Sequence, residues 1–144
     1  MKSFFQSTSF QFITTGIIGS VWVFHGLYSK ILSGIPRHAM IVERVLGERI
    51  AGQATLLIGA MEILLGIWVY SRVKRRACAL VQTLALVAMN SLEIILARDL
   101  LISALGMVAL NSALIALIWH WALAGARADQ RLTSHPDCQS PQAP

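Results

Sequence analysis

Charged residues are scarce in this chain, and their scarcity excludes an ordinary water-soluble domain. Asp, Glu, Lys and Arg make up 13% of the 144 residues, whereas hydrophobic residues make up 56%. Soluble domains carry about 25% charged residues. One domain of this length buries too small a fraction of its surface to hide so much apolar area from water. A lipid bilayer is therefore the expected solvent.

Cysteine is almost absent too, which excludes a disulfide framework and a thiolate metal site. Cys78 and Cys138 lie far apart, and neither belongs to a C-x-x-C motif. His25 and His120 are expected near opposite membrane faces, roughly 20 Å apart by helix rise, so they cannot share one haem iron. No basic–aromatic pattern typical of nucleic-acid binding is present either. We therefore expect no metal, no covalent cofactor and no nucleic-acid partner.

Four long apolar runs dominate the sequence. They span about residues 10–28, 50–70, 77–97 and 100–123. Each is near the roughly 20 residues that a helix needs to cross the hydrocarbon core. Irregular backbone cannot face lipid, so each run must be helical. The prediction is an all-α, membrane-spanning four-helix bundle over residues 1–124.

The segments outside these runs are also interpretable. Residues 38–47 place their apolar side chains on one side, which predicts a short amphipathic helix on the membrane surface between helices 1 and 2. Those side chains are Ile41, Val42, Val45 and Leu46. Residues 125–144 are polar, lack periodicity and contain three prolines. We predict that they form a disordered tail.

Lysine and arginine counts predict the orientation. With the N-terminus inside, seven of these residues lie on the inner side and five, Lys30 among them, on the outer side. The dense basic turn at residues 72–76 weighs most, because short loops carry the positive-inside signal. Trp119 and Trp121 are expected in an aromatic belt at the same interface. We predict a multi-pass protein of a bacterial-type plasma (inner) membrane with both termini cytoplasmic.

Several polar residues fall within the predicted spans. Helix rise places one group in the outer leaflet and a second, deeper level formed by Glu62 and Asn111. The outer group consists of His25, Gln53, Asn90 and Glu93. Glu62 shares a stripe with glycines and should face the bundle interior, because an acid facing lipid is costly. Asn111, at matching depth, is its expected partner.

Each level has two interpretations. Glu62 and Asn111 either form an interhelical polar clasp without chemistry, or supply a carboxyl that handles a proton or a polar ligand group. In the outer group, Glu93 can reach toward Arg98 and His25 toward interfacial water. Alternatively, an acid, an imidazole and amides form a shallow pocket for a quinone-like headgroup.

Three short patterns resemble DoxX-like membrane proteins. Residues 25–30, HGLYSK, resemble the G-L-x-x-K end of their first helix, and residues 61–66, MEILLG, resemble the E-x-x-x-G of their second. A basic turn follows, and Asn111 matches an asparagine of their last helix. The resemblance covers about residues 10–123 and implies a four-helix membrane bundle. Relatives have been linked to thiosulfate:quinone oxidoreductase subunits and to other membrane oxidoreductase complexes.

The leading hypothesis is an accessory subunit of a quinone-linked membrane redox system, not catalytic alone. Its candidate partners are the lipid bilayer, membrane oxidoreductase subunits and a second copy of the chain, with quinone as the candidate cofactor. The alternatives are a small proton-coupled permease or exporter, and a structural or assembly protein without catalysis. The candidate ligand-binding or proton-handling residues are Glu62, Asn111, His25, Lys30, Asn90, Glu93 and Gln53.

The orientation can be tested with alkaline phosphatase fusions. Fusion after Gly125 should be inactive and fusion after Lys30 active, because the enzyme folds only outside the cytoplasm and the basic turn holds the inner side. The opposite pattern would contradict the predicted topology.

Overall fold

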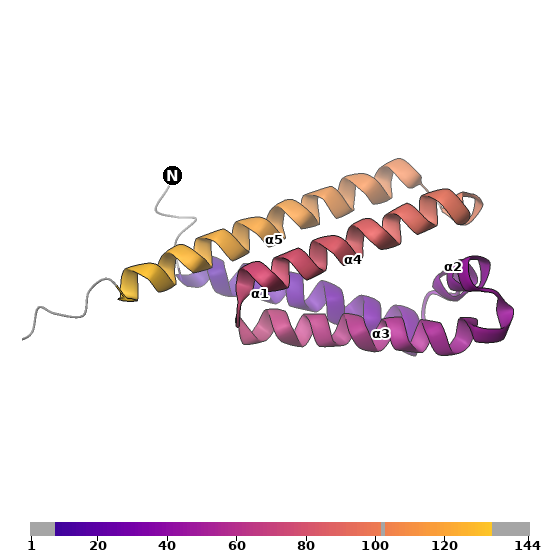
Figure 1. The fold of residues 1–144 in the computed structure, drawn as a ribbon, viewed down its shortest axis with the longest axis horizontal. Helices are drawn as coiled ribbons and strands as arrows, with labels where there is room; N and C mark the ends of the chain where they lie inside the picture. Colours follow the sequence, from indigo (N-terminus) through magenta and orange to yellow (C-terminus); the bar gives the residue numbers. More distant parts are fainter. Residues whose placement is uncertain (1–7, 102, 134–144) are drawn as a thin grey trace, which may run out of the picture.

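The computed structural model describes residues 8–101 and 103–133, which form helices joined by turns, with no strand among them. This confirms the all-α prediction. The elements are α1 (Thr8–Val23), the π-helix η2 (Phe24–Ile31), α2 (Pro36–Leu46), α3 (Glu48–Ser71), α4 (Arg75–Leu96), the 3-10 helix η3 (Arg98–Leu100) and α5 (Ala104–Thr133) (Figure 1). Within the described residues, four helical stretches are long and apolar enough to cross a membrane: residues 9–31, 48–71, 75–96 and 104–125.

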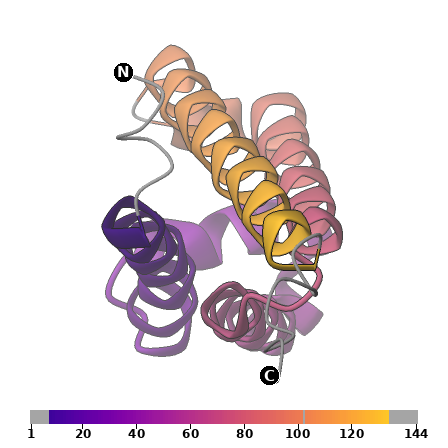
Figure 2. The same cartoon turned by 90° about the vertical axis from the view of Figure 1, so that its left-hand side faces the viewer.

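The spanning helices form two pairs. The continuous α1–η2 segment packs along α3, and α4 packs along α5. We call the end that holds the α3–α4 connection, residues 72–74, the turn end, and the opposite end the α2 end. The pairs converge at the turn end and diverge toward the α2 end, where α2 lies between them (Figures 1 and 2). The bundle is therefore closed at one end and split at the other.

The apolar core lies toward the turn end and is tied by indole hydrogen bonds. Trp22 donates to the buried Gln82 Oε1 at 2.7 Å, which joins the two pairs. Trp121 donates to Thr15 Oγ1 at 2.8 Å and is fully buried. Trp121, expected in the aromatic belt at this end, therefore points into the bundle, where its indole nitrogen finds a hydroxyl partner.

Glycines close the seam between α1–η2 and α3, and those of α3 lie on the stripe that also carries Glu62. A Cβ added at Gly59 would lie 2.9 Å from the carbonyl oxygen of Gly26, and one added at Gly66 would lie 2.7 Å from Val23 Cγ2. Without a hydrophobic drive between helices in lipid, such close backbone approach is a main source of packing energy. The two backbones meet where only glycine fits.

The structure departs from the sequence predictions at three helix ends. The first span continues past Tyr28 to Ile31 because it changes to π-helix, with Leu32 N–H donating to Leu27 O at 2.8 Å. The short helix starts at Pro36 and buries Ile41 and Val42 against the bundle. The last helix starts at Ala104 and runs past Gly125 to Thr133, into the predicted tail. Residues 134–144, including Cys138, lie outside the described residues.

The glycine seam predicts a position-specific effect of a leucine substitution. Gly59→Leu should destabilise the bundle by about 1–3 kcal/mol or more, because overpacking forces the backbones apart. Gly52→Leu on the same helix is the matched control, since no atom lies within 4 Å of the added Cβ. Thermal unfolding in detergent measures both. Equal melting temperatures for the two variants would contradict the role of Gly59.

Candidate functional site

A buried ion pair joins the first and second spans. Lys30 Nζ lies 2.7 Å from Glu62 Oε1 and 2.8 Å from Oε2, and the side chains are only 4% and 5% exposed. Lys30 lies on η2, whose π-helical register directs it, with the neighbouring Ser29, toward the interior. The prediction that Asn111 is the partner of Glu62 is therefore wrong. A carboxylate prefers an ammonium group that the π-turn brings within hydrogen-bond distance.

The ion pair lies in the wall of a cavity between the two helix pairs at the α2 end. The cavity has a volume of about 600 Å³ and is partly open. It receives residues from α1, η2, α2, α3, α4 and α5. Its polar lining is formed by His25, Lys30, Arg37, His38, Glu62, Asn90, Glu93, Ser103 and Asn111. This volume lies within the range of about 300–1,000 Å³ that is typical of small-molecule sites.

Two imidazoles stack in this lining. The rings of His25 and His38 lie 5.9 Å apart between centroids and are nearly parallel, at 4°. Burial, with the charges of Lys30, His25 and Arg37 nearby, lowers the pKa of His38 from 6.5 to about 4. His38 is therefore neutral at neutral pH. Its buried Nδ1 has no hydrogen-bond partner among the described residues.

The opposite wall carries two amides and an acid. Asn111 Nδ2 on α5 donates to Asn90 Oδ1 on α4 at 2.6 Å. This bond uses one of the two N–H groups of Asn111 and leaves the amide of Asn90 free to donate. Glu93 lies in the same wall, and among the described residues it has no ion-pair partner within 4 Å. The expected reach of Glu93 toward Arg98 is therefore not observed.

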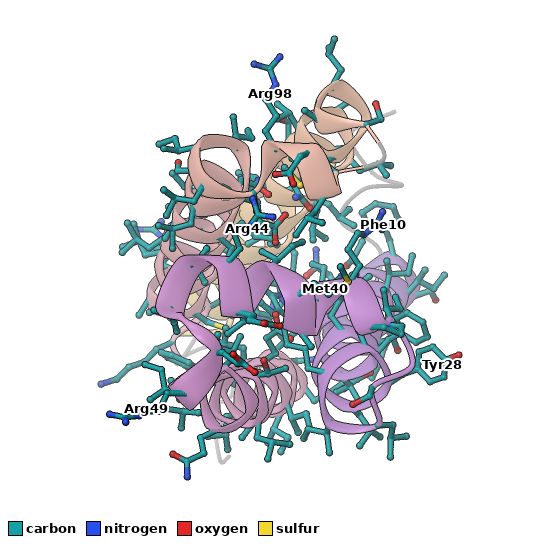
Figure 3. The ribbon with its side chains drawn as sticks, turned by 90° about the vertical axis from the view of Figure 1, so that its right-hand side faces the viewer. Phe10, Tyr28, Met40, Arg44, Arg49 and Arg98 are labelled. Atoms are coloured by element: carbon teal, nitrogen blue, oxygen red, sulfur yellow. The ribbon has the colours of Figure 1, made fainter. Side chains whose placement is uncertain are left out.

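The structure brings together all the predicted site residues except Gln53. Gln53 is exposed on α3 and does not line the cavity. Sequence reasoning missed Arg37 and His38, which α2 contributes as it lies across the α2 end (Figure 3). Pro36 in the sequence indicates where this helix begins, because proline is favoured in the first turn of a helix. Arg37 and His38 follow it in that turn. Arg37 and His38 face the spanning helices only because residues 32–35 turn the chain back toward them.

A comparison with protein families places these residues in a known context. The model of the DoxX-like family matches residues 19–119. That range contains the ion pair, both stacked imidazoles and the amide pair. The chain belongs to the DoxX-like family. No curated protein and no solved structure matches it.

The site of this DoxX-like protein is rich in hydrogen-bond donors. An ammonium group has three N–H donors, and Glu62 takes up two of those on Lys30. The third, the Asn90 amide and the imidazoles can all serve a molecule in the cavity. Among the described residues, no three His, Cys, Asp or Glu side chains gather closely enough to hold a metal ion. The arrangement suits a neutral ligand with carbonyl or hydroxyl oxygens.

The ion pair of this DoxX-like protein predicts non-additive substitutions. Lys30→Met or Glu62→Leu alone should each cost about 3–5 kcal/mol, because each leaves one buried charge unpaired. The double variant should recover most of that loss, since replacing a whole buried pair by apolar residues is often neutral. Unfolding in detergent measures all three.

If the double variant instead lost the sum of the two single losses in unfolding free energy, the two charges would be acting separately. Glu62→Gln is less informative, because it also leaves the Lys30 ammonium without a countercharge.

Proposed function

We propose that this chain is an accessory subunit of a quinone-linked membrane redox system and that its cavity holds the quinone headgroup. The observation that carries the proposal is the donor-rich cavity inside a four-span bundle, walled by the Lys30–Glu62 pair. Quinone carbonyl oxygens accept hydrogen bonds. Lys30, His25 and Asn90 would hold them, each with a donor for which the described residues offer no partner.

The residues present fit such a headgroup. A neutral ring with two carbonyl oxygens needs donors on facing walls, and the cavity has Lys30 on one pair of helices and Asn90 on the other. Bound quinone would supply two-electron, two-proton redox chemistry, which these side chains cannot carry out. The protein's own groups would orient the ring and exclude water. Glu93 and His38 would hold or pass protons, since both line the cavity.

We assign electron delivery to a partner subunit. The cavity presents amine, imidazole, amide and carboxyl groups, which exchange protons and hydrogen bonds. The resemblance to subunits of membrane oxidoreductases supports a partner of that kind. The alternative of a proton-coupled exporter is less well supported, because the core around Trp22 and Trp121 closes the turn end and leaves the cavity without a second opening there.

We further propose a bacterial-type plasma membrane with both ends of the chain cytoplasmic. The ion pair strengthens this assignment. Lys30, counted with the outer loops in the sequence analysis, is buried and neutralised by Glu62, so it adds no positive charge to the outer side. The basic turn at residues 72–76, at the other end of the bundle, still contributes its basic residues to the count for the inner side. The positive-inside difference is therefore larger than the raw counts indicate.

Quinone binding tests the proposal directly. The full chain in lipid nanodiscs should bind a benzoquinone with a ten-carbon chain, and His25→Phe should weaken that binding about tenfold. The loss corresponds to about 1.4 kcal/mol, near the net value of one hydrogen bond. Phenylalanine keeps a ring against His38 but removes the imidazole N–H.

Gln53→Leu is the matched control, because it removes an exposed polar side chain outside the cavity. It should bind quinone like the unaltered protein. Vesicles from a strain lacking the chain should also lose quinone-dependent oxidation of a donor, and the unaltered gene should restore it. Absence of quinone binding, or full oxidation without the chain, would overturn the proposed function.

A further inference from the structure

The cavity has walls on most sides, and the position of its opening decides which molecules can enter. We infer that it opens sideways into the lipid between the α1–η2 segment and α5, and that it takes an amphipathic ligand. The polar head would lie against Lys30, Asn90 and the imidazoles, while an apolar tail stays in the bilayer. This inference rests on the proposed function only for the identity of the headgroup.

Two of the four lateral seams are closed by direct contact. Between α1–η2 and α3, the backbones of Gly26 and Gly59 are too close to admit even an added methyl group. Between α4 and α5, the Asn90–Asn111 hydrogen bond lies level with the cavity. A second bond between these helices joins Trp119 Nε1 to Thr83 Oγ1 at 3.1 Å. A ligand cannot pass through either seam without separating these contacts.

The third seam, between α3 and α4, is covered by α2. Val42 of α2 is buried, and α2 packs against both α3 and α4. A smaller cavity of about 120 Å³ lies beneath it, lined mainly by apolar residues that include Val42, Ile58 and Leu92. This space is itself partly open and shares Lys30 and Glu93 with the main cavity, so α2 covers this seam without sealing it.

Both ends of the cavity are covered as well. At the turn end, the Trp22–Gln82 and Trp121–Thr15 hydrogen bonds join the helix pairs across the core. At the α2 end, the α2 helix crosses the space between the pairs, as seen in Figure 3. Its far end is tied to η3 by an ion pair, with Arg44 Nη2 3.2 Å from Asp99 Oδ2. α2 therefore lies across the direct path from water.

The fourth seam, between α1–η2 and α5, has the properties of an entrance. α5 packs extensively on α4 and also contacts α1, but it makes little or no contact with η2. Leu110 of α5 lines the cavity and is nevertheless 74% exposed, which places it at the rim. Val21 and Met107 also line the cavity along this seam. The rim is apolar and faces the surface that lipid covers.

The contrast between rim and interior defines the ligand class. Apolar side chains at the entrance favour an alkyl or isoprenoid chain, because no polar partner is offered there. Unused donors further inside favour a head with carbonyl or hydroxyl oxygens. A soluble, multiply charged molecule would meet no net countercharge, because Lys30 and Arg37 in the lining are balanced by Glu62 and Glu93. The ligand therefore reaches the site by diffusion within the membrane.

Collision accessibility of spin labels tests the opening without any ligand. In a background with both cysteines replaced by alanine, a label at Met107→Cys should collide with oxygen, which dissolves in lipid, and not with a water-soluble nickel chelate. Leu57→Cys, 66% exposed in the middle part of α3 and not in the cavity lining, gives the lipid reference. Arg49→Cys, exposed at the start of α3, gives the water reference. Chelate collision at residue 107 matching that at residue 49 would overturn the inference.

Quinone probes in nanodiscs test the ligand class. Leu110→Trp should narrow the entrance and weaken binding of the ten-carbon benzoquinone about tenfold, whereas the matched Leu105→Trp should not. The same benzoquinone with a methyl group in place of the chain should bind the unaltered protein at least tenfold more weakly. Equal affinities for the two probes, or equal effects of the two tryptophans, would overturn the assignment. Failure of both probes to bind would overturn the proposed quinone, while the spin labels would still decide where the cavity opens.

Discussion

The Lys30–Glu62 ion pair is the interaction on which the rest of this structure depends. Neither charge is stable alone in the low-dielectric interior of a membrane bundle. Their contact requires the first and second spans to approach closely, which Gly26 and Gly59 allow, and requires Lys30 to turn inward, which the π-helix η2 achieves. Local π-helix is frequent at functional sites, where it re-aims one side chain at a small cost in helix geometry. The glycines in the sequence, the π-helical register and the close helix contact are thus all needed to bring Lys30 Nζ to the Glu62 carboxylate.

The ion pair also explains why the bundle is tight at one end and split at the other. Toward the turn end, apolar side chains and tryptophan hydrogen bonds fill the space between the helix pairs. At the α2 end, the helices diverge around polar groups that satisfy one another in two sets, Lys30 with Glu62 and Asn90 with Asn111. Each set joins helices within one pair. Among the residues that the structure describes, no side-chain hydrogen bond or ion pair joins the two pairs across the cavity, and α2 covers the remaining space.

The sequence predicted the parts of this fold that depend on hydrophobicity and helix periodicity. Four spans, the short amphipathic helix and the glycine seam all follow from patterns along single helices. The DoxX-like resemblance, carried by the motifs around Lys30 and Glu62, is confirmed by the family match. Helix rise gave Glu62 and Asn111 the same depth, yet their partners differ from the prediction, because depth does not say which helices are neighbours. The π-turn that brings Lys30 inward leaves no periodic signal in the sequence.

His38 is a second residue whose place in the site could not be predicted from the sequence. The residue precedes the apolar positions of α2, and its sequence neighbourhood is that of a surface helix. It becomes part of the site only because residues 32–35 reverse the chain, with Ser33 at a φ of +51°, and return α2 across the spans. A one-dimensional pattern records which face of α2 is apolar but not what that face covers. The cavity therefore combines residues from six helical elements whose relative positions only the folded chain defines.

The balance of satisfied and unsatisfied polar groups argues for a ligand site over a purely structural clasp. A clasp needs each buried donor to be matched by an acceptor, and apolar packing would serve the same purpose at lower desolvation cost. Here the matched groups surround a space of about 600 Å³, and the buried His38 Nδ1 stays unmatched within the described residues. Buried polar atoms left without partners are rare in folded proteins. A ligand oxygen or proton would complete the hydrogen bonding of this wall, which gives the polar residues a use that helix packing alone does not.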